Sequence, residues 1–134
     1  TSAAVRGLSA EPLLGPLDLR GKDAQGSALD AYDGDPKLDL VIIGGESGNG
    51  AHHCDIGWIR SLIGQCRDAG RAAFVKQLGA KPVVASGSVP AFDPLPKLRD
   101  RKGGSMEEWP EDLRVRQMPD FSLAAQGLFA GDRK

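Results

Sequence analysis

Three charged side chains stand near the ends of apolar segments in this sequence, and their types could bind a small polar ligand. Glu11 and Glu46 each follow such a segment or its closing glycines, and Lys76 lies near the end of a third. A carboxylate accepts hydrogen bonds from cationic or hydroxylated groups. A lysine inside an apolar strand is costly unless it is paired or reaches the rim of the sheet. We therefore expect Lys76 either to pair with one of the two glutamates or to lie on an exposed strand face.

The loop around Glu46 is rich in glycine, and three interpretations of it stay open. Its glycines could let backbone N–H groups approach a phosphate or nucleotide, or the loop could orient a ligand through its carboxylate. The third interpretation is a tight turn that uses glycine for positive φ. The loop has neither the Lys-Ser/Thr ending of a P-loop nor the glycine spacing of a dinucleotide fingerprint. The ligand-binding residues predicted here are Glu11, Gly44, Gly45, Glu46, Ser47, Gly48 and Lys76.

Two histidines and a cysteine follow this loop but do not predict a metal site. Adjacent side chains in an extended segment point in opposite directions, so His52 and His53 rarely chelate one ion. Simple exposure of these histidines to solvent is the preferred interpretation, and contact with an anion bound at the loop is the weaker alternative. Cys66 lies on the apolar face of a predicted helix, twelve residues beyond Cys54, and is expected to be a core residue. We predict no metal ligand and no catalytic residue.

The apolar pattern places these residues on a strand–helix–strand unit. Ala3–Ala10, Leu38–Gly44 and Ala72–Leu78 predict strands. Apolar residues with a helical period fill the segment between Asp55, a good N-cap, and Gly70, a good C′ residue. A unit of this length favours a right-handed parallel crossover. Parallel strands would bring the three charged residues to one rim of the sheet.

The remaining segments carry weaker signals. Prolines break any long element after Gly79, so a turn-rich tail is expected there. We expect residues 1–80 to form a partial β/α barrel unit and residues 81–134 to form an extension that packs on it. Shorter predicted features are a turn at Ala28–Tyr32, strands at Val83–Ala85 and Leu113–Val115, and a helix at Ser122–Phe129.

Length and charge bound the class of protein. The chain has 134 residues, a formal net charge of −1 and two cysteines, which suits one modest domain with reduced thiols. The basic segments Lys97–Lys102 and Arg114–Arg116 alternate with acids and lack interleaved aromatics, so nucleic acid is not an expected partner. No segment approaches the ~20 consecutive apolar residues of a membrane span, and no secretory signal is apparent. A cytoplasmic protein is the simplest interpretation.

Several motifs in a fixed order carry a resemblance to a known family. They are EPLLG from Glu11, GGESG from Gly44, WIRSL from Trp58, KQLG from Lys76, and the segment from Asp100 to Arg114. Together they resemble the C-terminal half of a phage and bacterial family of uncharacterised radical-SAM-like proteins, over nearly the whole chain. The resemblance implies an α/β fold that is a partial (half) TIM-type barrel. It would have about three parallel strands, one well-defined helix and an irregular Pro-rich C-terminal tail.

The resemblance also sets expectations for cofactors. Full-length members look like barrels that open with a three-cysteine segment, which would hold a [4Fe–4S] cluster that cleaves S-adenosylmethionine. Cys54 and Cys66 cannot supply three thiolates. We therefore expect no cofactor on this chain alone, and S-adenosylmethionine with a [4Fe–4S] cluster only if a partner supplies the missing half.

A half barrel also leaves strand edges unpaired and one face uncovered. A homodimer, an N-terminal half-barrel partner or coverage by the tail is therefore expected. The leading hypothesis is a non-catalytic remnant of a radical-SAM-like barrel whose polar rim binds a small or nucleotide-like ligand. The alternatives are the C-terminal subunit of a split radical-SAM enzyme and a small protein-interaction module.

Overall fold

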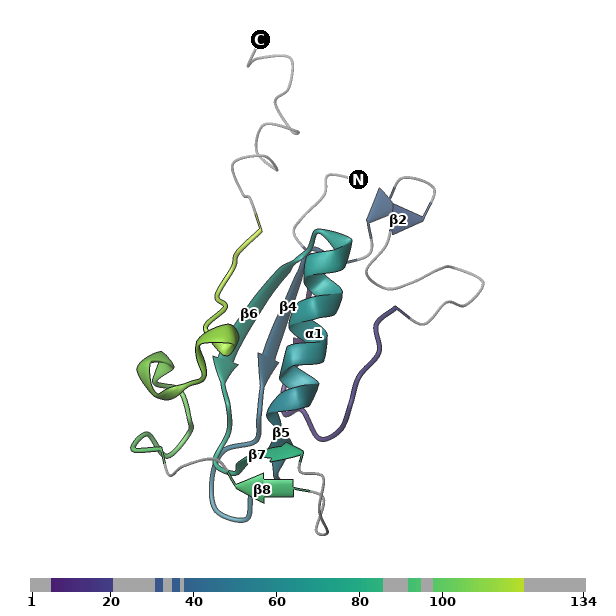
Figure 1. Ribbon diagram of the computed structural model, residues 1–134. Helices are drawn as coiled ribbons and strands as arrows, with labels where there is room; N and C mark the ends of the chain where they lie inside the picture. Colours follow the sequence, from purple (N-terminus) through teal and green to yellow (C-terminus); the bar gives the residue numbers. More distant parts are fainter. Residues whose placement is uncertain are drawn as a thin grey trace.

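A sheet of three parallel strands is the centre of the fold (Figure 1). The computed structural model describes residues 6–20, 31–32, 35–36, 38–85, 92–94 and 98–119. The strands are β1 (Gly7–Ala10), β4 (Leu40–Gly44) and β6 (Ala72–Gln77), in the order β1-β4-β6. All three lie at or within the predicted segments, so the parallel strands expected from the sequence are confirmed.

One helix, α1 (Ile56–Ala69), lies along this sheet (Figure 1). The Asp55 carboxylate accepts a hydrogen bond from the Gly57 N–H at 2.8 Å and caps the first turn. Gly70 ends the helix with φ +71°, in the left-handed region that glycine adopts most easily. The predicted helix and both of its ends are confirmed.

The core lies between α1 and one face of the sheet. Side chains alternate along a strand, so every second residue of β4 and β6 points toward the helix. These inward side chains pack against the apolar stripe of α1, where Ile59, Leu62 and Cys66 are fully buried. The inward residues of the two strands are Val41, Ile43, Ala73 and Val75.

Shorter strands lie beyond the central sheet. β7 (Pro82–Ala85) pairs in parallel with β5 (Cys54–Asp55) and antiparallel with β8 (Phe92–Pro94). β7 includes the strand predicted at 83–85. β2 (Ala31–Tyr32) and β3 (Asp35–Pro36) form a separate antiparallel pair. The turn predicted at 28–32 falls partly outside the described residues, and the helix predicted at 122–129 lies wholly outside them.

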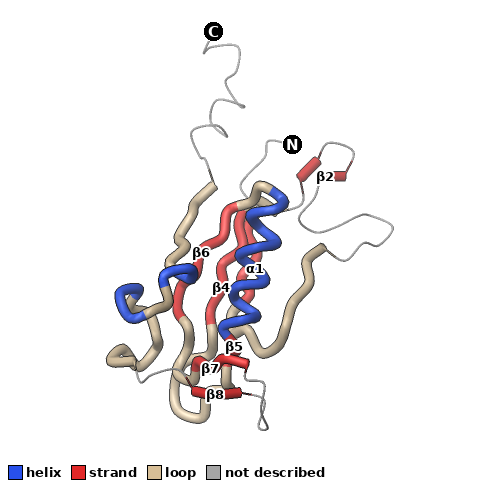
Figure 2. Tube along the Cα trace, viewed as in Figure 1, coloured by secondary structure: helices blue, strands red, loops and turns tan. Residues whose placement is uncertain are grey.

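Residues 98–119 are irregular but run along the free edge of β6 (Figure 2). The Val75 N–H donates to the Val115 carbonyl and the Gln117 N–H donates to the Ala73 carbonyl, both at 2.8 Å. The segment holds two short 3-10 turns, η1 (Met106–Glu108) and η2 (Glu111–Leu113). The strand predicted at 113–115 is therefore wrong, because Leu113 ends a turn that follows Pro110, and the bridge to β6 is made later, by Arg116.

The sheet does not close into a barrel within the described residues. The neighbour of β6 on its outer side is the antiparallel run at 115–117, where a barrel would place another parallel strand. The α/β class with parallel strands and one helix is thus established, whereas the half TIM-type barrel is not confirmed. The part of the chain that the structure describes also contains no helix with the length and apolar character that a membrane span requires.

Candidate functional site

The carboxyl ends of the central strands bring Glu11 and Lys76 together. The Lys76 Nζ lies 3.2 Å from the Glu11 Oε1, across 65 positions of sequence. Glu11 directly follows β1, and Lys76 lies where the pairing register between β4 and β6 shifts by one residue. Such an irregularity re-aims a side chain. Of the two partners that the sequence left open for Lys76, the structure selects Glu11.

Gly44 makes room for the Glu11 carboxylate. A Cβ atom at position 44 would lie 2.7 Å from the Glu11 Oε2, closer than such an atom is found to approach. That oxygen is buried and has no hydrogen-bond partner among the residues that the structure describes. A buried carboxyl oxygen without a donor costs free energy. The site therefore has unused capacity to accept one hydrogen bond.

Glu46 has a different environment from Glu11. Its Oε1 lies 2.7 Å from both the backbone N and the ring Nδ1 of His52. These hydrogen bonds, the backbone one first, lower the pKa of the Glu46 carboxyl from its usual value. The backbone carbonyl of Glu46 accepts a hydrogen bond from the Ala80 N–H at 2.8 Å. Glu46 thus stabilises the glycine loop through its contacts with His52 and Ala80.

Gly45 lies where three stretches of backbone cross. A Cβ atom there would lie 2.3 Å from the Leu78 carbonyl oxygen, and one at Gly79 would lie 2.9 Å from the Glu46 carbonyl oxygen. A Cβ atom at Gly103 would lie 2.6 Å from the Gly79 carbonyl oxygen. We call Gly45, Gly79 and Gly103 the glycine crossing. It joins three of the motifs on which the family resemblance rests, GGESG, KQLG and the segment that begins at Asp100.

The outer part of the glycine loop adopts turn geometry. Gly48 has φ +96° and Gly50 has φ +76°, and neither would meet another atom if it carried a Cβ. Both conformations are rare for residues with side chains. Ser47 is exposed. These geometries agree with the turn interpretation, and no contact of the described loop residues indicates a ligand.

The two cysteines are core residues. Cys54 and Cys66 are both fully buried, and burial raises the pKa of their thiols to about 12 and about 11 respectively. Thiols with such pKa values are poor ligands and poor nucleophiles at neutral pH. Among the described residues, no group of three or more His, Cys, Asp or Glu side chains could hold a metal ion.

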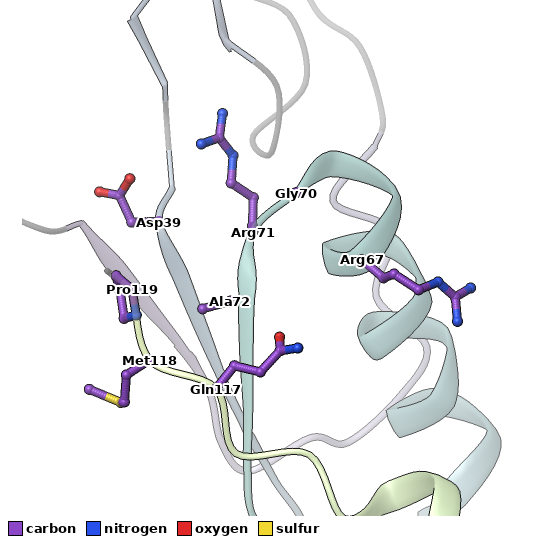
Figure 3. Close-up of a pocket in the computed structure, with 8 residues that line it drawn as sticks. All are labelled: Asp39, Arg67, Gly70, Arg71, Ala72, Gln117, Met118 and Pro119. Atoms are coloured by element: carbon purple, nitrogen blue, oxygen red, sulfur yellow. The ribbon is translucent and has the colours of Figure 1, made fainter. Parts of the chain in front are cut away.

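A cavity of about 500 Å³ lies at the opposite end of the sheet, beside the starts of β4 and β6 (Figure 3). The side chains of Asp39, Arg67 and Arg71 border it but point away from one another. The Asp39 Oδ2 accepts the Arg6 N–H at 2.8 Å, and Arg67 pairs with Asp68 at 3.6 Å. Because its charged groups do not converge, this cavity is not the candidate site.

Sequence reasoning missed two contributors to the site region. The 102–104 segment reaches the strand ends through backbone hydrogen bonds, from Leu78 N to Gly103 O at 2.8 Å and from Gly79 N to Lys102 O at 3.0 Å. Arg116 lies over the Phe74 ring at 5.2 Å and donates to the carbonyls of Val75 and Lys76. The sequence signals for these two contributors were the glycine pair after Lys102 and Arg116 itself. Neither signal predicts which distant segment the residues contact.

Comparison with known proteins places the chain in a family without assigning it a chemistry. A family model described as "Protein of unknown function (DUF5131)" matches residues 1–116. That description contains nothing that links the chain to radical-SAM chemistry. Neither the curated proteins nor the solved structures contain a match. Because the match extends over most of its length, the chain belongs to this DUF5131 family.

Proposed function

We propose that this protein binds a small polar ligand, without catalysing its conversion, at the carboxyl ends of β1, β4 and β6. The observation that carries the proposal is the buried, unpartnered Oε2 of Glu11. A ligand with an N–H or O–H donor would supply the missing hydrogen bond, and one to a charged acceptor contributes about 1.5–3 kcal/mol.

The geometry supports a site that needs little rearrangement. Lys76 holds the other carboxylate oxygen, so the Glu11 side chain is already oriented. About a quarter of that side chain, 23%, is open to solvent, so a ligand can approach the Glu11 carboxyl group. The Lys76 side chain is 55% exposed and can pair with an anionic group on the same ligand. A ligand with a donor and an anionic group side by side matches both residues.

The descent of this site from a radical-SAM-like barrel is part of the proposal and rests on the sequence resemblance. The chain's own residues do not fit a [4Fe–4S] cluster, because that group needs three or four thiolates and the two buried cysteines cannot supply them. The alternative role as C-terminal subunit of a split enzyme would require a partner that brings both the cluster and S-adenosylmethionine. A role as an interaction module, a homodimer and a cytoplasmic location remain predictions.

Titration of the intact protein with S-adenosylmethionine and with adenosine, followed by NMR, tests the site. We expect shifts at Glu11, Gly44 and Lys76, and a loss of affinity of at least tenfold in Glu11→Gln. The amide would keep one oxygen for Lys76 and place a donor where the ligand's donor must bind. Glu111→Gln makes the same chemical change on an exposed 3-10 turn and should bind as the parent does. Equal affinities for all three proteins would reject the site.

A further inference from the structure

Three exposed cationic side chains lie on segments near the glycine crossing. Within the described residues, the side chains of Lys81, Arg101 and Lys102 take part in no ion pair and no hydrogen bond. Most other charged groups nearby are paired, as Lys76 is with Glu11 and Arg99 with Glu108. A surface lysine or arginine without a partner is ordinary, but three of them on converging segments concentrate positive charge.

The chain fold brings these three residues to one place. Arg101 and Lys102 lie in the turn that precedes Gly103, and the Lys102 carbonyl accepts the Gly79 N–H at 3.0 Å. Lys81 lies two residues beyond Gly79, a distance of at most ~7 Å along an extended chain. Side chains of this length can therefore reach a common point beside the crossing.

The acidic residues of the same region are already occupied by backbone donors. The Asp100 carboxylate accepts the N–H groups of Lys102 at 2.9 Å and Gly104 at 3.2 Å. The Glu108 carboxylate accepts the N–H groups of Arg99 at 2.7 Å and Asp100 at 3.1 Å. These hydrogen bonds stabilise the 98–108 turns, and within the described residues neither carboxylate forms an ion pair with Lys81, Arg101 or Lys102.

We propose that Lys81, Arg101 and Lys102 form a phosphate-binding subsite next to the Glu11–Lys76 pair. Its place as a subsite rests on the proposed function, which puts the rest of the ligand at Glu11. Lys76 lies three residues before Gly79, so at most ~10 Å of extended chain separates the pair from the crossing. The ligand class is then a small phosphorylated molecule, such as a nucleotide, whose donor groups face Glu11 and whose phosphate faces the three cations.

Titrations with inorganic pyrophosphate, ATP and adenosine test this subsite. We expect pyrophosphate to shift the signals of the three cationic residues, and ATP to bind at least tenfold more tightly than adenosine. The advantage of ATP should shrink as salt is raised, because the cations are exposed. In the double variant Lys81→Gln, Lys102→Gln, pyrophosphate binding should be lost and the ATP affinity should fall to that of adenosine.

Arg67→Gln is the matched control, since it removes one exposed positive charge at the far end of the sheet. It should leave pyrophosphate and ATP binding unchanged. Pyrophosphate that binds the double variant as tightly as the parent would overturn the subsite. If adenosine shifted the NMR signals of Glu11 but ATP bound no more tightly than adenosine, the subsite alone would be overturned and the proposed function would stand. Pyrophosphate binding without any adenosine binding would support the subsite and reject the site at Glu11.

A further titration, with an oligonucleotide, distinguishes a small phosphorylated ligand from nucleic acid, since both present phosphate groups. A single-stranded DNA oligomer is expected to bind more weakly, per molecule, than ATP. Binding of the oligomer with at least tenfold higher affinity than ATP would reject the small-ligand class, because several backbone phosphates would then be engaged at once.

Discussion

At the scale of single residues, Gly79 is a position where the backbone leaves no space for a side chain. Its φ is +92°, and a Cβ atom would lie 2.9 Å from the Glu46 carbonyl oxygen and from the Gly45 Cα. We expect Gly79→Ala to lower the free energy of unfolding by about 3 kcal/mol, the combined cost of positive φ and overpacking. Urea denaturation monitored by circular dichroism measures this difference.

Gly48→Ala separates the two costs. Gly48 has nearly the same φ, +96°, but a Cβ atom there would meet nothing within 4 Å. Gly48→Ala should therefore lower the free energy of unfolding by only about 1 kcal/mol, which is the cost of the positive φ alone. If the two variants lost equal stability, backbone crowding at the glycine crossing would not contribute.

For Glu11 and Glu46, the sequence predicts the position of the side chain at a strand end but not its hydrogen-bond partner. Both stand after an apolar strand, and the sequence predicted both as ligand-binding residues. Their positions at the carboxyl ends follow from the strand pattern and were predictable. What distinguishes them is His52, which folds back on Glu46, and Lys76, which a register shift turns toward Glu11. The contact of Lys76 has no local sequence signal because it depends on the register shift between β4 and β6, and that of His52 depends on the turn geometry of the glycine loop, which residue types alone do not specify.

At the scale of elements, α1 holds the segment after β1 through one buried amide. Gln65 is 3% exposed, and its side chain donates to the Leu17 carbonyl at 3.0 Å and accepts the Leu19 N–H at 2.8 Å. We expect Gln65→Leu to destabilise the protein by about 2 kcal/mol, because it leaves two backbone groups without these partners. Faster hydrogen exchange at the Leu19 amide would report the local release.

Ser61→Ala is the comparison for this variant. Ser61 accepts a single hydrogen bond from Gln65 at 2.9 Å and is otherwise exposed. Its loss should cost at most about 1 kcal/mol and leave exchange at Leu19 nearly unchanged. A Gln65 variant that matched it would show that the 17–19 segment is held by its apolar contacts alone.

Elements with a strong periodic pattern were predictable, and those without one were not. The helix has an apolar repeat and clear capping residues, the two longer strands are apolar segments closed by glycine, and the structure contains all three. The 98–119 segment shows neither a helical nor a strand period of apolar residues. Part of its backbone hydrogen-bonds to β6. Its turns depend on carboxylates that accept backbone N–H groups, as Asp100 and Glu108 do. Local patterning therefore predicts a turn-rich extension that packs on the sheet and helix, but it does not predict the hydrogen bonds to β6 that residues 98–119 make.

At the scale of the whole molecule, residues 98–119 complete the core that the sheet and helix begin. Trp109 is 2% exposed and Leu113 is fully buried, and both belong to the cluster around α1 and β6. Trp109 also donates its Nε1–H to the Gly103 carbonyl at 2.8 Å, so the same side chain fixes the glycine crossing. Stability and the geometry of the proposed site are thus coupled through one residue.

Trp109→Ala and Leu113→Ala should each lower the free energy of unfolding by about 3 kcal/mol or more, as large-to-small core substitutions do. Met118→Ala in the same segment, at a side chain that is 52% exposed, should change it by less than about 0.5 kcal/mol. Because Trp109 also donates a hydrogen bond to Gly103 of the crossing, Trp109→Ala should weaken pyrophosphate binding more than Leu113→Ala does, under conditions where both variants are still folded. Full retention of stability in both core variants would mean that this segment is a dispensable cover, and the site would then have to be completed by another part of the chain.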